Sequence, residues 1–106
     1  KTAQVIGVSM EPFFQEGDIV FYKKYYPRHS SLNVGDIVLL NHPLKKIILI
    51  KRISHINRLG IKVIGDNKNN SDDSNLFGLI RKELILGIVT SKLSYKFFKK
   101  FKCLFI

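Results

Sequence analysis

The dipeptide Gly-Asp opens two short β-branched runs in this chain, and this repeated pattern constrains the fold more than any other feature. Gly17-Asp18 precedes Ile19 to Tyr22, and Gly35-Asp36 precedes Ile37 to Leu40. Glycine and aspartate favour turns, whereas β-branched and aromatic residues favour strands. Further apolar strand candidates are residues 5–8, 47–56, 61–64 and 85–89. The pattern predicts an all-β domain built on a strongly bent antiparallel sheet or partial barrel.

A polar loop and a basic tail complete the predicted organisation. Residues 65–75 contain no large apolar side chain and are typical of a loop. Residues 92–106 contain five lysines and no acidic residue, interleaved with aromatic side chains. Drawn as a helix, this tail suits an anionic membrane surface, the start of a membrane span, or packing on the core. We therefore predict one folded domain at 1–91 and a short amphipathic helix within 92–106.

The composition limits the classes of function. A chain of 106 residues with one cysteine predicts a single domain without an internal disulfide or a multi-thiolate metal site. The sequence has no run of about 18 apolar residues, so a complete transmembrane helix is not predicted. The first residues do not resemble a signal peptide. Because the chain begins with Lys1, we expect a fragment or a processed form. The net charge of +10 favours nucleic acid, anionic lipid or an acidic partner.

Ser9 is the first candidate for chemistry. It follows a short apolar stretch and precedes Met10 and the chain-stiffening Pro12, a pattern that predicts a place on a cleft rim. Its own backbone N–H is a candidate donor to an oxyanion. Because loop serines commonly satisfy backbone groups, a purely structural role stays open on this pattern alone.

Lys51 is the second candidate. In strand register it shares a face with Ile47, Leu49 and Ile53, all of which are apolar. Desolvation on such a face lowers the pKa of a lysine, and a neutral amine accepts a proton from a serine hydroxyl. A charged residue that guards an edge strand is the alternative interpretation.

The polar loop supplies the third group of candidates. Its hydroxyl at Ser71 can hold the lysine amine, and Asp73 can pair with Arg52. A calcium site is not predicted, because Lys68, Ser71 and Phe77 stand where an oxygen ligand, a glycine and a glutamate are required. The three histidines form no zinc motif, and we expect no metal and no organic cofactor.

In their order along the chain, these residues resemble the signal peptidase I superfamily. Its members carry a Ser-Met-x-Pro box, a Gly-Asp-x-Val box, a Lys-Arg box and a Gly-Asp-Asn…Ser-x-Asp-Ser-Arg box. The matching segments are Ser9-Met10-Glu11-Pro12, Gly35-Asp36-Ile37-Val38, Lys51-Arg52, Gly65-Asp66-Asn67 and Ser71-Asp72-Asp73-Ser74. The brevity of the chain and its His42-Pro43 step look most like the small nickel-type superoxide dismutase maturation proteases.

The resemblance implies a role for each matching position. Ser9 would be the nucleophile, with its backbone N–H as an oxyanion donor, and Lys51 would be the general base. Ser71 would orient the lysine, and Asp73 with Arg52 would support the geometry of the loop.

The resemblance also implies a protein or peptide substrate that binds as an extended strand and contacts Met10 and Pro12. Relatives usually carry Thr after the proline and Arg after the last Asp-Ser pair, where this chain has Phe13 and Asn75. Because Asn75 replaces that arginine, Asp73 loses one partner, and Arg52 of the Lys-Arg box is the partner that remains.

The predicted function is a serine endopeptidase with a Ser/Lys dyad that removes an N-terminal signal or propeptide, with nickel superoxide dismutase as one candidate substrate. The alternatives are a LexA-like self-cleaving peptidase domain and a non-catalytic basic β-barrel that binds nucleic acid. The four ordered boxes favour the peptidase, so we expect no nucleic-acid partner. We expect a bacterial protein, membrane-associated or cytoplasmic, whose residues 92–106 contact an anionic membrane surface.

Overall fold

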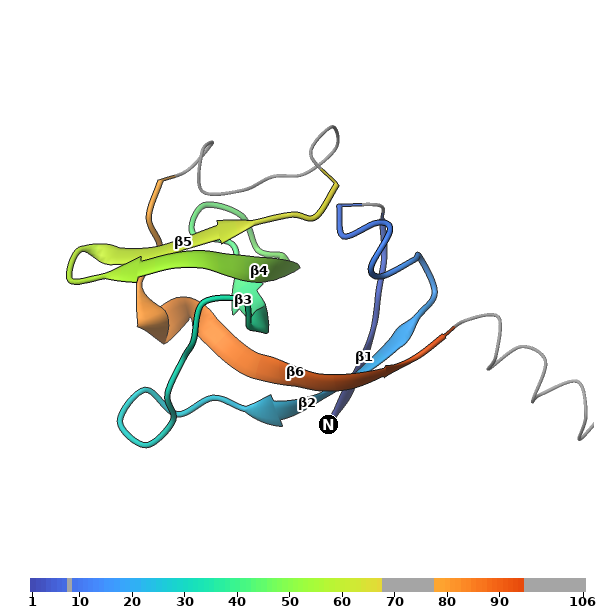
Figure 1. The fold of residues 1–106 in the computed structure, drawn as a ribbon, viewed down its shortest axis with the longest axis horizontal. Coiled ribbons are helices and arrows are strands. Elements are labelled where there is room, and N and C mark those ends of the chain that lie inside the picture. Colours follow the sequence, from blue (N-terminus) through green and yellow to red (C-terminus); the bar gives the residue numbers. More distant parts are fainter. Residues whose placement is uncertain (8, 68–77, 95–106) are drawn as a thin grey trace, which may run out of the picture.

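The computed structural model describes residues 1–7, 9–67 and 78–94, which form one six-stranded antiparallel sheet (Figure 1). Its strands are β1 (Thr2–Gln4), β2 (Ile19–Lys24), β3 (Ile37–Asn41), β4 (Ile48–Asn57), β5 (Gly60–Ile64) and β6 (Ile85–Leu93), with a 3₁₀-helix, η1 (Lys82–Leu84), before β6. The order across the sheet is β1-β2-β6-β3-β4-β5. The predicted all-β class with a bent antiparallel sheet is confirmed.

Most strands lie where the apolar runs predict them, but both ends of the fold differ. The first strand is Thr2–Gln4, whereas residues 5–7 of the predicted stretch continue as a loop. At the other end, β6 continues to Leu93 and so includes the first two residues of the predicted tail. Residues 95–106, with the predicted helix, lie outside the described residues. Within the described ranges, no helix has the length and apolar character that a membrane span requires.

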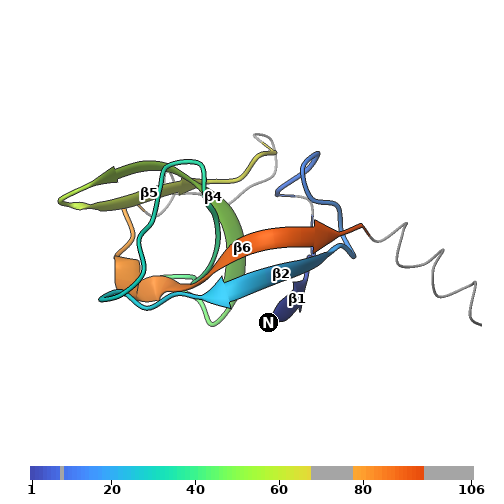
Figure 2. The same ribbon diagram turned by 60° about the horizontal axis from the view of Figure 1, so that its bottom comes forward.

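Register shifts bend the sheet. They lie between Phe21 and Tyr22 in β2, between Leu39 and Leu40 in β3, and between Ile53 and His55 in β4. Such irregularities in a ladder increase the local twist and turn the strand. The hairpin of β4 and β5 therefore faces the arm made by β1, β2 and β6 across the fold (Figure 2).

Two hydrophobic cores lie on the two faces of β3, which is a central strand. The larger core consists of Tyr25, Val38, Leu40, Ile53, Ile61, Val63, Ile80, Ile85 and Ile88. The smaller core consists of Val5, Met10, Phe14, Val20 and Ile37. Burial on both faces explains why 37–40 is a continuous apolar run rather than an alternating one. The smaller core holds the segment that carries Ser9.

Candidate active site

A mainly apolar cleft of about 320 Å³ has the half-buried Ser9 on its wall. Its lining comes from β1 and the segment that follows, from β2 and β3, and from the start of β4. The lining residues are Ala3, Gln4, Val5, Ile6, Ser9, Val20, Leu39, Ile48, Leu49 and Ile50. The predicted position of Ser9 beside a cleft therefore agrees with the structure.

The turn after Ser9 is fixed by burial and by backbone hydrogen bonds. Met10 and Phe14 are each 1% exposed in the smaller core, and the Phe14 N–H donates to the Met10 carbonyl over 2.9 Å. On the other side of the serine, Gly7 has a φ of +88°, a conformation that glycine adopts without a steric penalty. The buried side chains thus hold the turn from within, while the serine stays half-buried at its start.

Lys51 is buried in the middle of the sheet. Its exposed fraction is 1%, and it pairs with Val38 of β3 on the face that also carries Ile53. β4 pairs with both β3 and β5, which excludes the interpretation that this lysine guards an edge strand. Lys51 does not line the cleft, but its chain neighbour Ile50 does.

Arg52, the next residue on β4, forms a bidentate ion pair with Asp66. Its Nε donates to Asp66 Oδ1 over 2.9 Å and its Nη2 to Oδ2 over 2.8 Å, while Nη1 donates to the Gly35 carbonyl over 3.2 Å. The hydrogen bonds to the Asp66 carboxylate, helped by its negative charge and opposed by burial, raise the pKa of the Arg52 guanidinium. The arginine therefore fastens the segment after β5 to β4.

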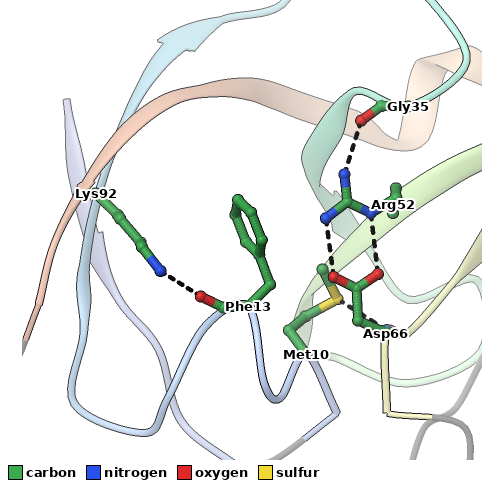
Figure 3. Close-up of polar contacts among 6 residues, drawn as sticks. All are labelled: Met10, Phe13, Gly35, Arg52, Asp66 and Lys92. Atoms are coloured by element: carbon green, nitrogen blue, oxygen red, sulfur yellow. Dashed lines mark hydrogen bonds and ion pairs between the residues drawn. The ribbon is translucent and has the colours of Figure 1, made fainter.

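The same segment contacts the turn that carries the serine. The Asn67 N–H donates to the Ser9 carbonyl over 2.8 Å, and the Asp66 N–H lies 3.5 Å from the Met10 sulfur (Figure 3). Asp66 and Asn67 thus connect the turn with β4. Asn67 binds the Ser9 carbonyl, and Asp66 binds Arg52, the neighbour of Lys51. Sequence reasoning gave Asp66 no specific partner, although its place in the Gly-Asp-Asn box was a usable signal.

The remaining predicted site residues lie in different parts of the chain, and two of them are outside the described residues. Ser71 and Asp73 lie outside the described residues, so their predicted roles stay predictions. Met10 is 1% exposed and packs in the smaller core, and its predicted contact with a substrate stays a prediction. Pro12 is exposed and lines a separate hollow with Phe13 and Lys92.

The sheet is open, a serine lies on the wall of an apolar cleft, and a lysine is buried on a strand that lines this cleft. This arrangement fits the class of β-sheet serine hydrolases. The family model described as signal peptidase, peptidase S26, matches residues 1–60. The chain therefore belongs to the signal peptidase family, and the superfamily predicted from its four boxes is confirmed.

The curated relatives share part of their length with this chain. A signal peptidase complex catalytic subunit SEC11 from Candida tropicalis is 32% identical over 99 residues, which cover 86% of this chain and 58% of the relative. The SEC11 subunit from Leptosphaeria maculans is 35% identical over 97 residues, covering 80% and 53%. The chain spans about half the length of the curated relatives it matches. Because these relatives are fungal, the prediction of a bacterial location is wrong.

Proposed function

We propose that this chain is the catalytic portion of a serine endopeptidase that removes an N-terminal signal or propeptide from protein substrates. Ser9 is the nucleophile and Lys51 is the general base. The observation that carries the proposal is the burial of Lys51, 1% exposed on β4, directly beside the Ile50 of the cleft that Ser9 lines. Membership of the peptidase S26 family supports it.

The proposed chemistry begins at the Lys51 amine. In its neutral form this amine accepts the proton of the Ser9 hydroxyl. The Oγ then attacks the peptide carbonyl carbon, while the backbone N–H of Ser9 stabilises the negative oxygen. The amine returns the proton to the leaving nitrogen, and water hydrolyses the ester on Ser9. In this proposal Ser71 orients the amine and Asp73 supports the loop beside Arg52.

The cleft suits an extended peptide. β1 lies at one end of the strand order, so a substrate strand can add beside it. Apolar side chains from β1 and β4 line the cleft, which favours small apolar groups near the cut. The relatives are named as catalytic subunits of a signal peptidase complex, so signal sequences are the first substrates to test. The propeptide of nickel superoxide dismutase is a more specific candidate substrate.

The test is cleavage of a library of signal sequences and propeptides, including that of nickel superoxide dismutase, in the presence of lipid vesicles. Wild type is compared with Ser9→Ala and Lys51→Arg. We expect cleavage by wild type alone, because a guanidinium does not lose its proton at working pH. Retained hydrolysis by Lys51→Arg would exclude the dyad. Shortening of the chain itself that depends on Ser9 would favour the LexA-like alternative.

A further inference from the structure

Phe13, where the superfamily usually carries threonine, lies between two cations. The Arg52 Cζ atom is 5.0 Å and the Lys92 Nζ atom 4.7 Å from the centroid of its ring, within the range of a cation–π interaction. The Lys92 ammonium also donates a hydrogen bond to the Phe13 carbonyl (Figure 3). Phe13 is 45% exposed, and its ring also packs edge-on against the buried Phe14 ring, with the two centroids 4.8 Å apart.

The two cations come from strands that are not neighbours. Arg52 belongs to β4 and Lys92 to β6, and β3 runs between them in the sheet. Two like charges repel each other, so their approach to one ring requires compensation. The aromatic ring, the Phe13 carbonyl and the Asp66 carboxylate supply it. Phe13 therefore bridges the two arms of the bent sheet from the turn that begins at Ser9.

We propose that Phe13 and Lys92 are positioning residues that clamp this turn from outside and so set the position of Ser9. The inference rests on the proposed function for its kinetic part. From within, the turn is held by two buried side chains, Met10 and Phe14. From outside, Lys92 fixes its backbone and Arg52 fixes its exposed ring. Since small misplacements of a nucleophile lower the rate of the chemical step, the clamp acts on kcat rather than on substrate binding.

Lys92→Met tests the ammonium, because methionine keeps an unbranched side chain of similar length without charge. We expect kcat to fall about fivefold while KM stays within about twofold. Lys92→Arg, which keeps a cation and a donor, restores most of kcat. The matched control is Lys24→Met, which removes an exposed cation that lies 5.8 Å from the Tyr26 ring. This control keeps the wild-type kcat.

A second pair of variants guards against misfolding. Phe13→Leu lowers kcat in the same way, and Phe13→Tyr, which keeps the ring, restores it. A kcat within twofold of wild type in both Lys92→Met and Phe13→Leu overturns the proposal. An equal loss in Lys24→Met also overturns it, because the effect would then follow net charge.

Hydrogen exchange separates this inference from the proposed function. The Asn67 amide, which donates to the Ser9 carbonyl, reports directly on the position of the turn. We expect its exchange to accelerate about threefold or more in Lys92→Met and to stay unchanged in Lys24→Met. This result supports the clamp even if no peptide is cleaved. Unchanged exchange in Lys92→Met overturns it whatever the activity.

Discussion

Arg52 connects three segments of the chain through one planar side chain. It holds the Asp66 carboxylate with two donors and the Gly35 carbonyl with a third, and its Cζ atom lies 5.0 Å from the centroid of the Phe13 ring. A guanidinium presents several donors in a fixed plane, whereas an ammonium is a single point of charge. The identity of this residue therefore affects the site beyond its charge.

Arg52→Lys should destabilise the fold by about 1–3 kcal/mol, because lysine cannot hold the carboxylate at two points and Gly35 together. The measurement is the free energy of unfolding in urea. Arg58→Lys, an exposed arginine in the β4–β5 turn, is the matched control and should change stability by less than about 0.5 kcal/mol. Equal effects of the two substitutions would contradict the role given to Arg52.

At this scale the sequence predicts residues with a local signature and misses those defined by long-range contacts. Burial of Lys51 follows from the apolar residues that alternate with it along one strand. The contact between Phe13 and Lys92 joins residues 79 positions apart, and no periodicity connects them. Met10 was predicted to contact a substrate, and its burial in the core was not predicted, because a motif does not state which way a side chain points.

The hairpin of β4 and β5 depends on Gly60, which begins β5 and lies close to the backbone at Ile80. Asn57 Oδ1 accepts hydrogen bonds from the Leu59 N–H over 2.8 Å and the Gly60 N–H over 3.2 Å, which closes a tight turn. Gly60 has a φ of +154°, and a Cβ there would lie 2.9 Å from the Ile80 carbonyl oxygen. The residues around Ile80 run beside β5, and this close approach requires the absence of a side chain.

Gly60→Ala should therefore destabilise the fold by about 2–4 kcal/mol, through backbone strain together with a steric clash. Gly35→Ala is the comparison, because Gly35 has a φ of +95° and a Cβ added there would meet nothing within 4 Å. It should cost only about 1–2 kcal/mol, from conformation alone. Thermal unfolding of both variants measures the difference. If Gly35→Ala were the more damaging change, steric contact with Ile80 would not explain the need for Gly60.

The elements that the sequence predicts well are those with apolar runs bounded by turns. β2 to β5 follow the β-branched segments closely, and Gly-Asp marks the start of two of them. β1 was missed because its three residues, Thr2–Gln4, are partly exposed and show no apolar alternation. Its pairing with β2, and not its own composition, defines it as a strand.

The whole molecule carries a net charge of +10, and the charge is unevenly distributed along the chain. Residues 92–106 contain five lysines without an acidic residue, and one of these, Lys92, belongs to β6. The six strands and both cores lie within residues 1–94. The tail was predicted to contact an anionic membrane surface, with the start of a membrane span and packing on the core as the alternatives. Removal of residues 95–106 distinguishes membrane binding from packing on the core.

A chain that ends at Ser94 should keep its stability and cleave a soluble peptide within about twofold of the full chain. Its binding to vesicles that contain anionic lipid should weaken at least about tenfold, because each lysine near such a surface contributes about 1 kcal/mol. Co-sedimentation measures this binding. A full-length control with Lys96, Lys99, Lys100 and Lys102 changed to Gln separates charge from apolar contact. If truncation instead lowers the unfolding free energy while vesicle binding persists, the tail is part of the folded core, and the basic residues of the domain itself must hold the membrane.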